Sequence, residues 1–402
     1  MAVLSSRVIL GVTLIVIVIG IIGYYIGYYT ATQRATVITS TPTSTVVTPK
    51  KVEVKAIRIG FEEYMPTRRI LGSVIASELK KLFPEVEVSI YPVSKSQRIL
   101  SLEFFELFAK GNLELVFTET TFLDLAWKRE FPFYMLPPNA RLPVHTLALY
   151  PVAMCIATTP ELKDKFGIKT WRDLDGKYIL MLPGPSGVSP EWRETAYWLM
   201  RDAFKILGIE LRMLGLGGPP PKPGEDPVRK YADMVADILR RGKTAGIENV
   251  VAVEIPIGAG ELPPVVLEIL TRMDLVIINP SPEDAEKIIK AGLPFDWVPV
   301  TAVNWTKPVG VDRMFCLRGW AGLATSPDVL PEDFVYKMLK HLIANRDKLL
   351  EQHKYFKEFA KDPIGVQVKA ISSAPHVPVH PGLAKLLKEY GVWRPEWKIA
   401  KG

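Results

Sequence analysis

Thr67, Arg68 and Arg69 are candidate binding residues because they place two guanidinium groups and a hydroxyl at the start of a predicted helix. They follow the predicted strand 56–61 and open the predicted helix 67–83. Positive charges in a first helical turn oppose the helix dipole at a cost of about 0.3–1 kcal/mol each, and a bound anion would reverse that cost. A guanidinium also holds a carboxylate through two parallel hydrogen bonds. The pattern predicts a carboxylate site, and a pair of solvated arginines is the alternative.

Further candidate contacts lie where later predicted strands end or begin. Ser94, Ser96 and Gln97 follow the second strand and could donate hydrogen bonds to a ligand. Glu119 ends the third strand, and its carboxylate could meet a substrate amine. Tyr150 begins a long apolar strand and is expected to wall a cleft. The structural alternatives are serine N-caps and a helix-capping acid.

The segment 183–189 has the pattern of a ligand-binding turn. It connects the predicted buried strand 178–182 to a helix that starts at Ser189-Pro190 and runs through Leu207. In an open α/β sheet, ligands sit beyond the carboxyl ends of the strands, where helix N-termini offer free N–H groups. A tight turn with Ser189 as a simple N-cap is the alternative.

The sequence contains no recognisable catalytic or metal-binding motif. It has no HExxH, GxSxG or P-loop pattern, and its two cysteines form no CxxC pair. We therefore predict neither enzymatic activity nor a cofactor or metal site. The net charge of +7 is spread along the chain without a basic stripe between aromatic residues, so nucleic acid is not an expected partner. The histidines are scattered: His145, His341, His353, His376 and His380.

The order of predicted elements indicates an α/β fold. Strands alternate with amphipathic helices, which is typical of parallel βαβ units. Two longer apolar strands, 145–159 and 314–325, lie far apart in the sequence. They predict a chain that crosses between two lobes and returns, with a ligand cleft between the lobes. The expected parts are lobe 1 over 53–150, lobe 2 over 151–315, and a return to lobe 1 with C-terminal helices over 316–402.

Cys155 and Cys316 each lie in one of these long strands. Crossing strands run close together, so a disulfide is one possibility if the compartment is oxidising. Buried free cysteines that act as small apolar fillers are the favoured alternative.

The N-terminus has the features of a membrane anchor. The segment 8–33 contains no charged residue, and about 20 apolar residues suffice to cross a bilayer. We expect a transmembrane helix over 1–30 and a Ser/Thr/Pro-rich stalk over 31–52. A cleaved signal peptide is the alternative. Both interpretations put the body outside the cytoplasm, and the first predicts a single-pass protein of the cell membrane.

The body also resembles a known family, the TAXI group of solute receptors for tripartite ATP-independent (TRAP) transporters. Its motifs occur in the family's order: Leu149–Pro151, Gly167–Thr170 with Asp173–Lys177, Pro183–Gly187, Leu330–Asp333, Val379–Gly382 and Tyr390-Gly391. The resemblance implies a two-lobed periplasmic-binding-protein-like clamshell. Such a receptor binds a small carboxylate or amino acid and delivers it to membrane transporter subunits. The resemblance also implies that Ser186 and Gly187 contact the ligand.

Two loops depart from the family pattern. Phe61–Thr67 stands where the family has a Gly-rich loop, and Val93–Gln97 replaces a Gly-Gly-Ser segment. Since these loops line the family's cleft, the ligand's identity does not carry over. The alternatives for function are a receptor of an ABC importer, a sensory ectodomain, or an enzyme on the same fold.

Overall fold

The computed structural model describes residues 53–62, 66–93, 100–130, 132–182, 199–215, 226–244 and 246–402. Val52–Gly402 forms one compact unit. The predicted anchor and stalk lie outside the described residues, as do Ser94, Ser96, Gln97, Ser186 and Gly187. Across the described ranges, every helix is too short or too polar to cross a bilayer.

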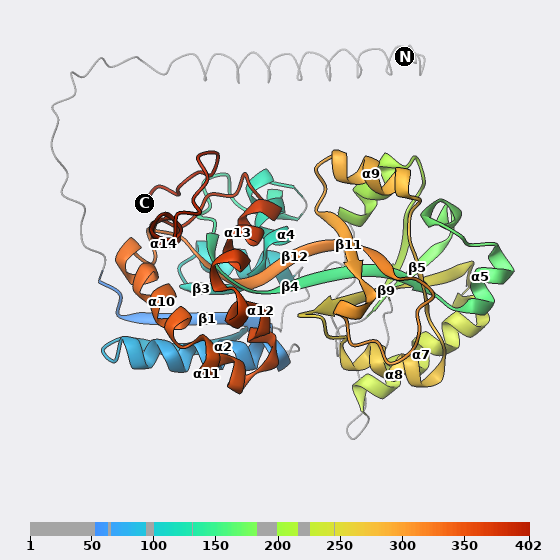
Figure 1. The fold of residues 1–402 in the computed structure, drawn as a ribbon, viewed down its shortest axis with the longest axis horizontal. Helices are drawn as coiled ribbons and strands as arrows, with labels where there is room; N and C mark the ends of the chain where they lie inside the picture. The colour runs from blue at the N-terminus through green and yellow to red at the C-terminus, as the bar shows by residue number, and fades with distance from the viewer. Residues whose placement is uncertain are drawn as a thin grey trace, which may run out of the picture. The chain divides into compact units, whose positions relative to one another are not determined.

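A ten-stranded sheet runs through the described part of the body (Figure 1). Its main path has the order β2-β1-β3-β12-β4-β9-β5-β6, with β10 paired to β4 and β11 paired to β12. A separate two-stranded sheet joins β7 and β8. The strands are β1 (Ala56–Glu62), β2 (Glu87–Val93), β3 (Leu115–Glu119), β4 (Val144–Thr158), β5 (Tyr178–Met181), β6 (Arg212–Gly215), β7 (Lys243–Thr244), β8 (Ile247–Glu248), β9 (Val250–Gly258), β10 (Val276–Ile278), β11 (Phe295–Pro299) and β12 (Arg313–Thr325).

Helices flank both ends of the sheet (Figure 1). The α-helices are α2 (Pro66–Leu82), α3 (Leu100–Ala109), α4 (Thr120–Lys128), α5 (Pro160–Phe166), α7 (Pro227–Arg241), α8 (Pro264–Arg272), α9 (Pro282–Lys290), α10 (Glu332–Ala344), α11 (Arg346–Gln352), α12 (Lys357–Lys361), α13 (Pro363–Ser373) and α14 (Pro381–Glu389). Short 3-10 turns span Phe133–Met135, Trp171–Leu174, Val300–Ala302 and Lys354–Phe356. The predicted α/β class is therefore confirmed.

The long strands β4 and β12 link two groups of elements (Figure 1). One group holds β1, β2 and β3 with α2, α10 and α14, and one hydrophobic core joins residues from 57–150 to residues from 321–397. The other group holds β5, β9 and β10 with α7 and α8, and its core joins residues from 155–316. A further hydrophobic core joins residues from 93–142 to residues from 156–317, and the division into two lobes with its residue boundaries stays a prediction.

The sheet is mixed, whereas the alternation of strands and helices predicted parallel pairing. The pairs β1–β2, β1–β3, β5–β6 and β5–β9 are parallel. The strand β12 inserts between β3 and β4 and runs antiparallel to both. A strand from late in the chain that enters the centre of the sheet leaves no signal in the local alternation of elements.

The predicted helix 331–353 is also divided. It forms α10 and α11, separated at Asn345, whose backbone has φ −103° and ψ 14°. The Asn345 side chain donates to the carbonyl of His341 at 2.9 Å and satisfies the end of α10. Asparagine competes with the helix backbone for hydrogen bonds in this way, which explains the break.

Candidate functional site

Two predicted site residues, Arg68 and Glu119, form an ion pair. Arg68 lies in the first turn of α2, directly after β1, and Glu119 is the last residue of β3. Since β1 and β3 are parallel neighbours, their carboxyl ends lie at the same edge of the sheet. There the Arg68 Nη2 atom donates to the Glu119 carboxylate. Opposite charges from two separate strand–helix connections therefore meet where α/β sheets bind ligands.

The charged pair is almost entirely enclosed. The Arg68 side chain is 5% exposed and that of Glu119 is 18% exposed. The guanidinium lies over the Phe117 ring, 5.5 Å from its centroid, so a cation–π contact adds to the ion pair. Because a buried charge is costly without a partner, the pair is held together strongly.

Tyr150, the predicted wall of the cleft, also belongs to this cluster. The strand β12 brings it close, because Ala321 pairs with Glu119 on one side and with Tyr150 on the other. Arg68 is hydrogen-bonded to the Tyr150 hydroxyl. Burial raises the pKa of Tyr150 far above its usual value, although Arg68 opposes the shift, so the phenol stays neutral.

Tyr355 completes the cluster and was not identified from the sequence. Its ring meets that of Tyr150 edge-on, with 5.0 Å between centroids. Burial raises the pKa of Tyr355, and the Thr67 side chain near its hydroxyl opposes this shift. Tyr355 belongs to the 3-10 turn Lys354–Phe356, far along the chain. A single tyrosine just beyond the end of the predicted helix 331–353 has no sequence signal that distinguishes it from a surface residue.

The structure also describes Arg69 and tests the capping alternative for Glu119. Arg69 is exposed on α2, whereas its neighbour Arg68 is buried in the cluster. Glu119 precedes α4 but its side chain makes no capping hydrogen bond, so the alternative of a helix-capping acid is wrong. The site defined by described residues is therefore Thr67, Arg68, Glu119, Tyr150 and Tyr355.

A cavity adjoins Glu119 but is too small for a ligand. It lies between β3, β4, β12 and α13, and its lining includes Trp320 and Gln367. It has room for about one water molecule. The Gln367 side chain forms two hydrogen bonds of 2.8 Å with the backbone of Ala148, one to the N–H and one to the carbonyl. These contacts are structural and attach α13 to the sheet.

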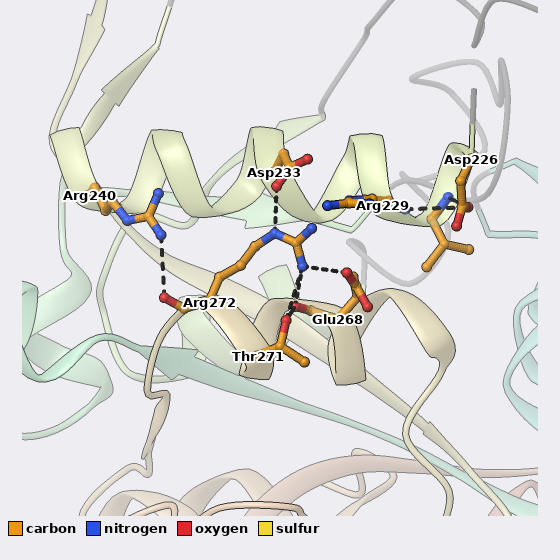
Figure 2. A network of polar contacts seen from close by, with 8 residues as sticks. Asp226, Arg229, Asp233, Arg240, Glu268, Thr271 and Arg272 are labelled. Carbon is orange, nitrogen blue, oxygen red and sulfur yellow. Dashed lines mark hydrogen bonds and ion pairs between the residues drawn. The ribbon is translucent and has the colours of Figure 1, made fainter. Parts of the chain in front are cut away.

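A second polar cluster joins α7 to α8 (Figure 2). The Arg272 guanidinium donates to Asp233 at 2.5 Å and to Glu268 at 2.7 Å, and Arg240 donates to the Arg272 carbonyl at 3.3 Å. The carboxylates raise the pKa of Arg272. The Arg272 charge is satisfied by acids of its own two helices, so the cluster holds α7 against α8 and offers no binding group.

Two buried histidines have structural roles. His145 and His380 are buried and contact backbone carbonyls of Ala374 and Leu330. Within the described ranges, no group of three or more His, Cys, Asp or Glu side chains has an arrangement that could hold a metal ion.

Comparison with known proteins gives one family match. Residues 247–391 match the NMT1-like family. No curated protein matches the chain significantly.

Several solved structures are similar over most of their length. The periplasmic aliphatic sulphonate binding protein SsuA from Escherichia coli is 14% identical, with 86% of this chain and 96% of that chain covered and a TM-score of 0.37. MatC from Rhodopseudomonas palustris with bound malate is 11% identical, with 81% and 97% covered and a TM-score of 0.42. The periplasmic binding protein BugD is 14% identical, with 85% and 99% covered and a TM-score of 0.39. At these TM-scores the similarity assigns neither ligand nor function.

Proposed function

We propose that this chain is an extracytoplasmic solute-binding receptor that captures a small carboxylate, preferably an amino acid, and delivers it to a TRAP-type transporter. In this proposal a transmembrane helix over 1–30 and a stalk over 31–52 tether the body to the cell membrane. The motif resemblance and the match of residues 247–391 to the NMT1-like family support a receptor. The observation that carries the ligand class is the Arg68–Glu119 ion pair at the carboxyl ends of β1 and β3.

The ion pair suits a ligand that carries both charges. A simple carboxylate must compete with Glu119 for the Arg68 guanidinium, and it would leave two negative charges beside one cation. An amino acid avoids this cost, because its carboxylate can bind Arg68 while its ammonium group binds Glu119. The internal ion pair is then exchanged for two ion pairs with the ligand, and no charge is left buried without a partner.

The aromatic rings around the pair would complete such a site. Phe117 lies beside the Arg68 guanidinium, and Tyr150 and Tyr355 form a wall on another side. Apolar walls with a few placed polar groups are the usual composition of small-molecule sites. They exclude water, and this strengthens each charged contact with the ligand.

A binding screen on the purified chain tests the ligand class. We expect thermal shift and calorimetry to detect one or more common L-amino acids, with weaker binding of succinate and 2-oxoglutarate and none of maltose. Glu119→Gln should weaken the amino acid by at least about tenfold, since it removes a charged contact worth about 1.5–3 kcal/mol, and should strengthen the dicarboxylates, since it removes the carboxylate that competes with them for Arg68. Stabilisation by maltose alone would refute the proposal.

Arg69 provides the matched control. Arg68→Lys removes the planar, two-pronged donor and should abolish most of the binding. Arg69→Lys changes the exposed neighbour on the same helical turn and should leave the affinity unchanged. Equal losses in the two variants would show that Arg68 has no special role.

The transporter partner has its own test. We expect the genes next to this one to encode a large multi-span permease of the TRAP type. A neighbouring ATPase subunit would instead indicate an ABC importer.

A further inference from the structure

Tyr355 connects the candidate site to the opposite group of strands. Its hydroxyl lies near the side chain of Thr67 and its ring packs on Tyr150, both in the first group. The same ring lies against Gly258, the last residue of β9 in the second group. Tyr150 is buried, whereas Tyr355 keeps part of its surface exposed. The Tyr355 ring therefore has a face available to a ligand.

Gly258 makes room for this ring. A Cβ atom at Gly258 would lie 3.3 Å from Cε2 of Tyr355 and 3.4 Å from its hydroxyl oxygen, which is tighter than ordinary van der Waals contact. The backbone of Gly258 has no left-handed conformation, unlike that of Gly260 at φ +77°. A glycine at position 258 thus leaves room for the Tyr355 ring. The backbone conformation at this position does not itself require glycine.

The turn that follows β9 is held against the Tyr355 segment by charge. The Gly258–Glu261 turn is closed by backbone hydrogen bonds of 2.8 and 3.0 Å between its end residues. The Glu261 carboxylate pairs with Lys354 at 2.8 Å and accepts from the Asn304 amide at 2.5 Å. This places an ion pair directly beside Tyr355, between the two groups of strands.

We propose that Tyr355 is a ligand-binding residue that closes the candidate site, and that the β9 turn positions it through Gly258 and Glu261. The proposal rests on the solute-binding function proposed above and adds a residue and a coupling to it. A ligand bound at Arg68 and Glu119 meets the Tyr355 ring as its outer wall. Gly258 pairs with Val152 of β4, two residues from Tyr150, so it is fixed in the sheet beside the ring that it positions.

Calorimetry with the common L-amino acids on the full chain tests the coupling. Tyr355→Ala should weaken the best-bound amino acid by at least about tenfold. Gly258→Ala should weaken it several-fold, because the new methyl group displaces the ring. In the Tyr355→Ala background, Gly258→Ala should have no further effect, since the ring it displaces is gone. Tyr336 lies on α10 and its hydroxyl donates to Glu389 of α14, so Tyr336→Phe should leave the affinity unchanged.

A second pair of variants keeps the test valid if Tyr355→Ala does not fold. Tyr355→Phe and Thr67→Val each remove one of two interacting hydroxyls, so each should weaken binding about two- to tenfold and together no more than either alone. If the wild-type chain binds an amino acid and the Tyr355 and Gly258 variants bind it with the same affinity, this inference is overturned and the proposed function stands. Absence of binding by every amino acid tested would overturn both.

Discussion

Cys155 on β4 and Cys316 on β12 lie side by side as buried free thiols, and each thiol donates to a backbone carbonyl, Cys155 to that of Ile255 and Cys316 to that of Met314. The pairing of Met154 with Leu317 sets this register, because the two cysteines are the next residues along the paired strands. The neighbouring Cys316 thiol and burial raise the pKa of Cys155 well above its usual value. The favoured expectation of two buried thiols matches this structure.

The first prediction concerns the reactivity of these thiols. A thiol with a raised pKa carries little thiolate at neutral pH, and a buried one is also shielded from reagents. We expect a disulfide reagent to label the native chain very slowly and to label both cysteines after unfolding without reductant. Two modified thiols per chain, counted by mass spectrometry, would agree with two free cysteines. A count of zero after unfolding would establish a disulfide instead.

The second prediction concerns Gly322, where β12 passes closest to β4. A Cβ atom there would lie 1.9 Å from the carbonyl oxygen of Leu147, at a register shift between the strands. Gly322→Ala should lower the free energy of unfolding by about 3 kcal/mol, since backbone must move. Gly72→Ala, in the middle of α2, is the control, because its Cβ atom would meet only the Ile90 side chain, at 3.9 Å. That variant should be neutral or stabilising by about 0.5–1 kcal/mol. Urea denaturation of both variants measures the difference, and equal effects would contradict the argument.

The third prediction is a loss of stability at mildly acidic pH. Burial lowers the pKa of His380 to about 4, although Asp328 opposes the shift. Burial also lowers the pKa of His145 to about 4, with a contribution from His376. In the unfolded chain these pKa values return to about 6.5, so between pH 6.5 and 4 the unfolded state binds protons that the folded state does not. The resulting stabilisation is complete above pH 6.5 and is lost as the pH falls, by up to about 3 kcal/mol per histidine.

His380→Asn separates this effect from carboxylate titration. His380 caps α14 by accepting from the Gly382 N–H at 3.1 Å, and asparagine is a good N-cap. The variant should be less stable at pH 7, because it loses the contact to Leu330, but its stability should fall less between pH 6.5 and 4.5. Parallel stability curves for wild type and variant in that interval would contradict the assignment.

The fourth prediction concerns the body without its N-terminal segment. Val52–Gly402 forms one compact unit, so a fragment with these bounds should be soluble and should unfold cooperatively. Size exclusion and a thermal melt, compared with the full chain in detergent, measure this. A fragment that aggregates and recovers only when residues 8–29 are restored would refute it.

Local sequence signals predicted most elements near their observed positions. The predicted helix 67–83 is α2 at Pro66–Leu82, and the predicted strand 145–159 is β4 at Val144–Thr158. These signals are short-range: side-chain periodicity and capping residues act within one element. Thr159 before Pro160, for example, accepts from the Leu162 N–H and starts α5 as an N-cap.

The candidate site was predictable only in part. The types and places of Arg68, Glu119 and Tyr150 indicated binding, because charged and aromatic side chains follow or begin strands whose ends can meet. Their contacts were not predictable, since the ion pair needs β1 and β3 as neighbours and Tyr150 needs β12 between β3 and β4. Tyr355 was missed for the same reason, because it reaches Thr67 only through tertiary packing.

The sequence by itself therefore determined the α/β class, the two long strands and the residue types of a proposed anion site. Each of these depends on neighbours within one element. Only the tertiary structure decided the mixed sheet, the pairing of Arg68 with Glu119, and the contact of Tyr355 with Gly258. The physical reason is that these contacts join residues distant in the chain. Which strand lies beside which is set by the burial of whole sheet faces and not by any local pattern.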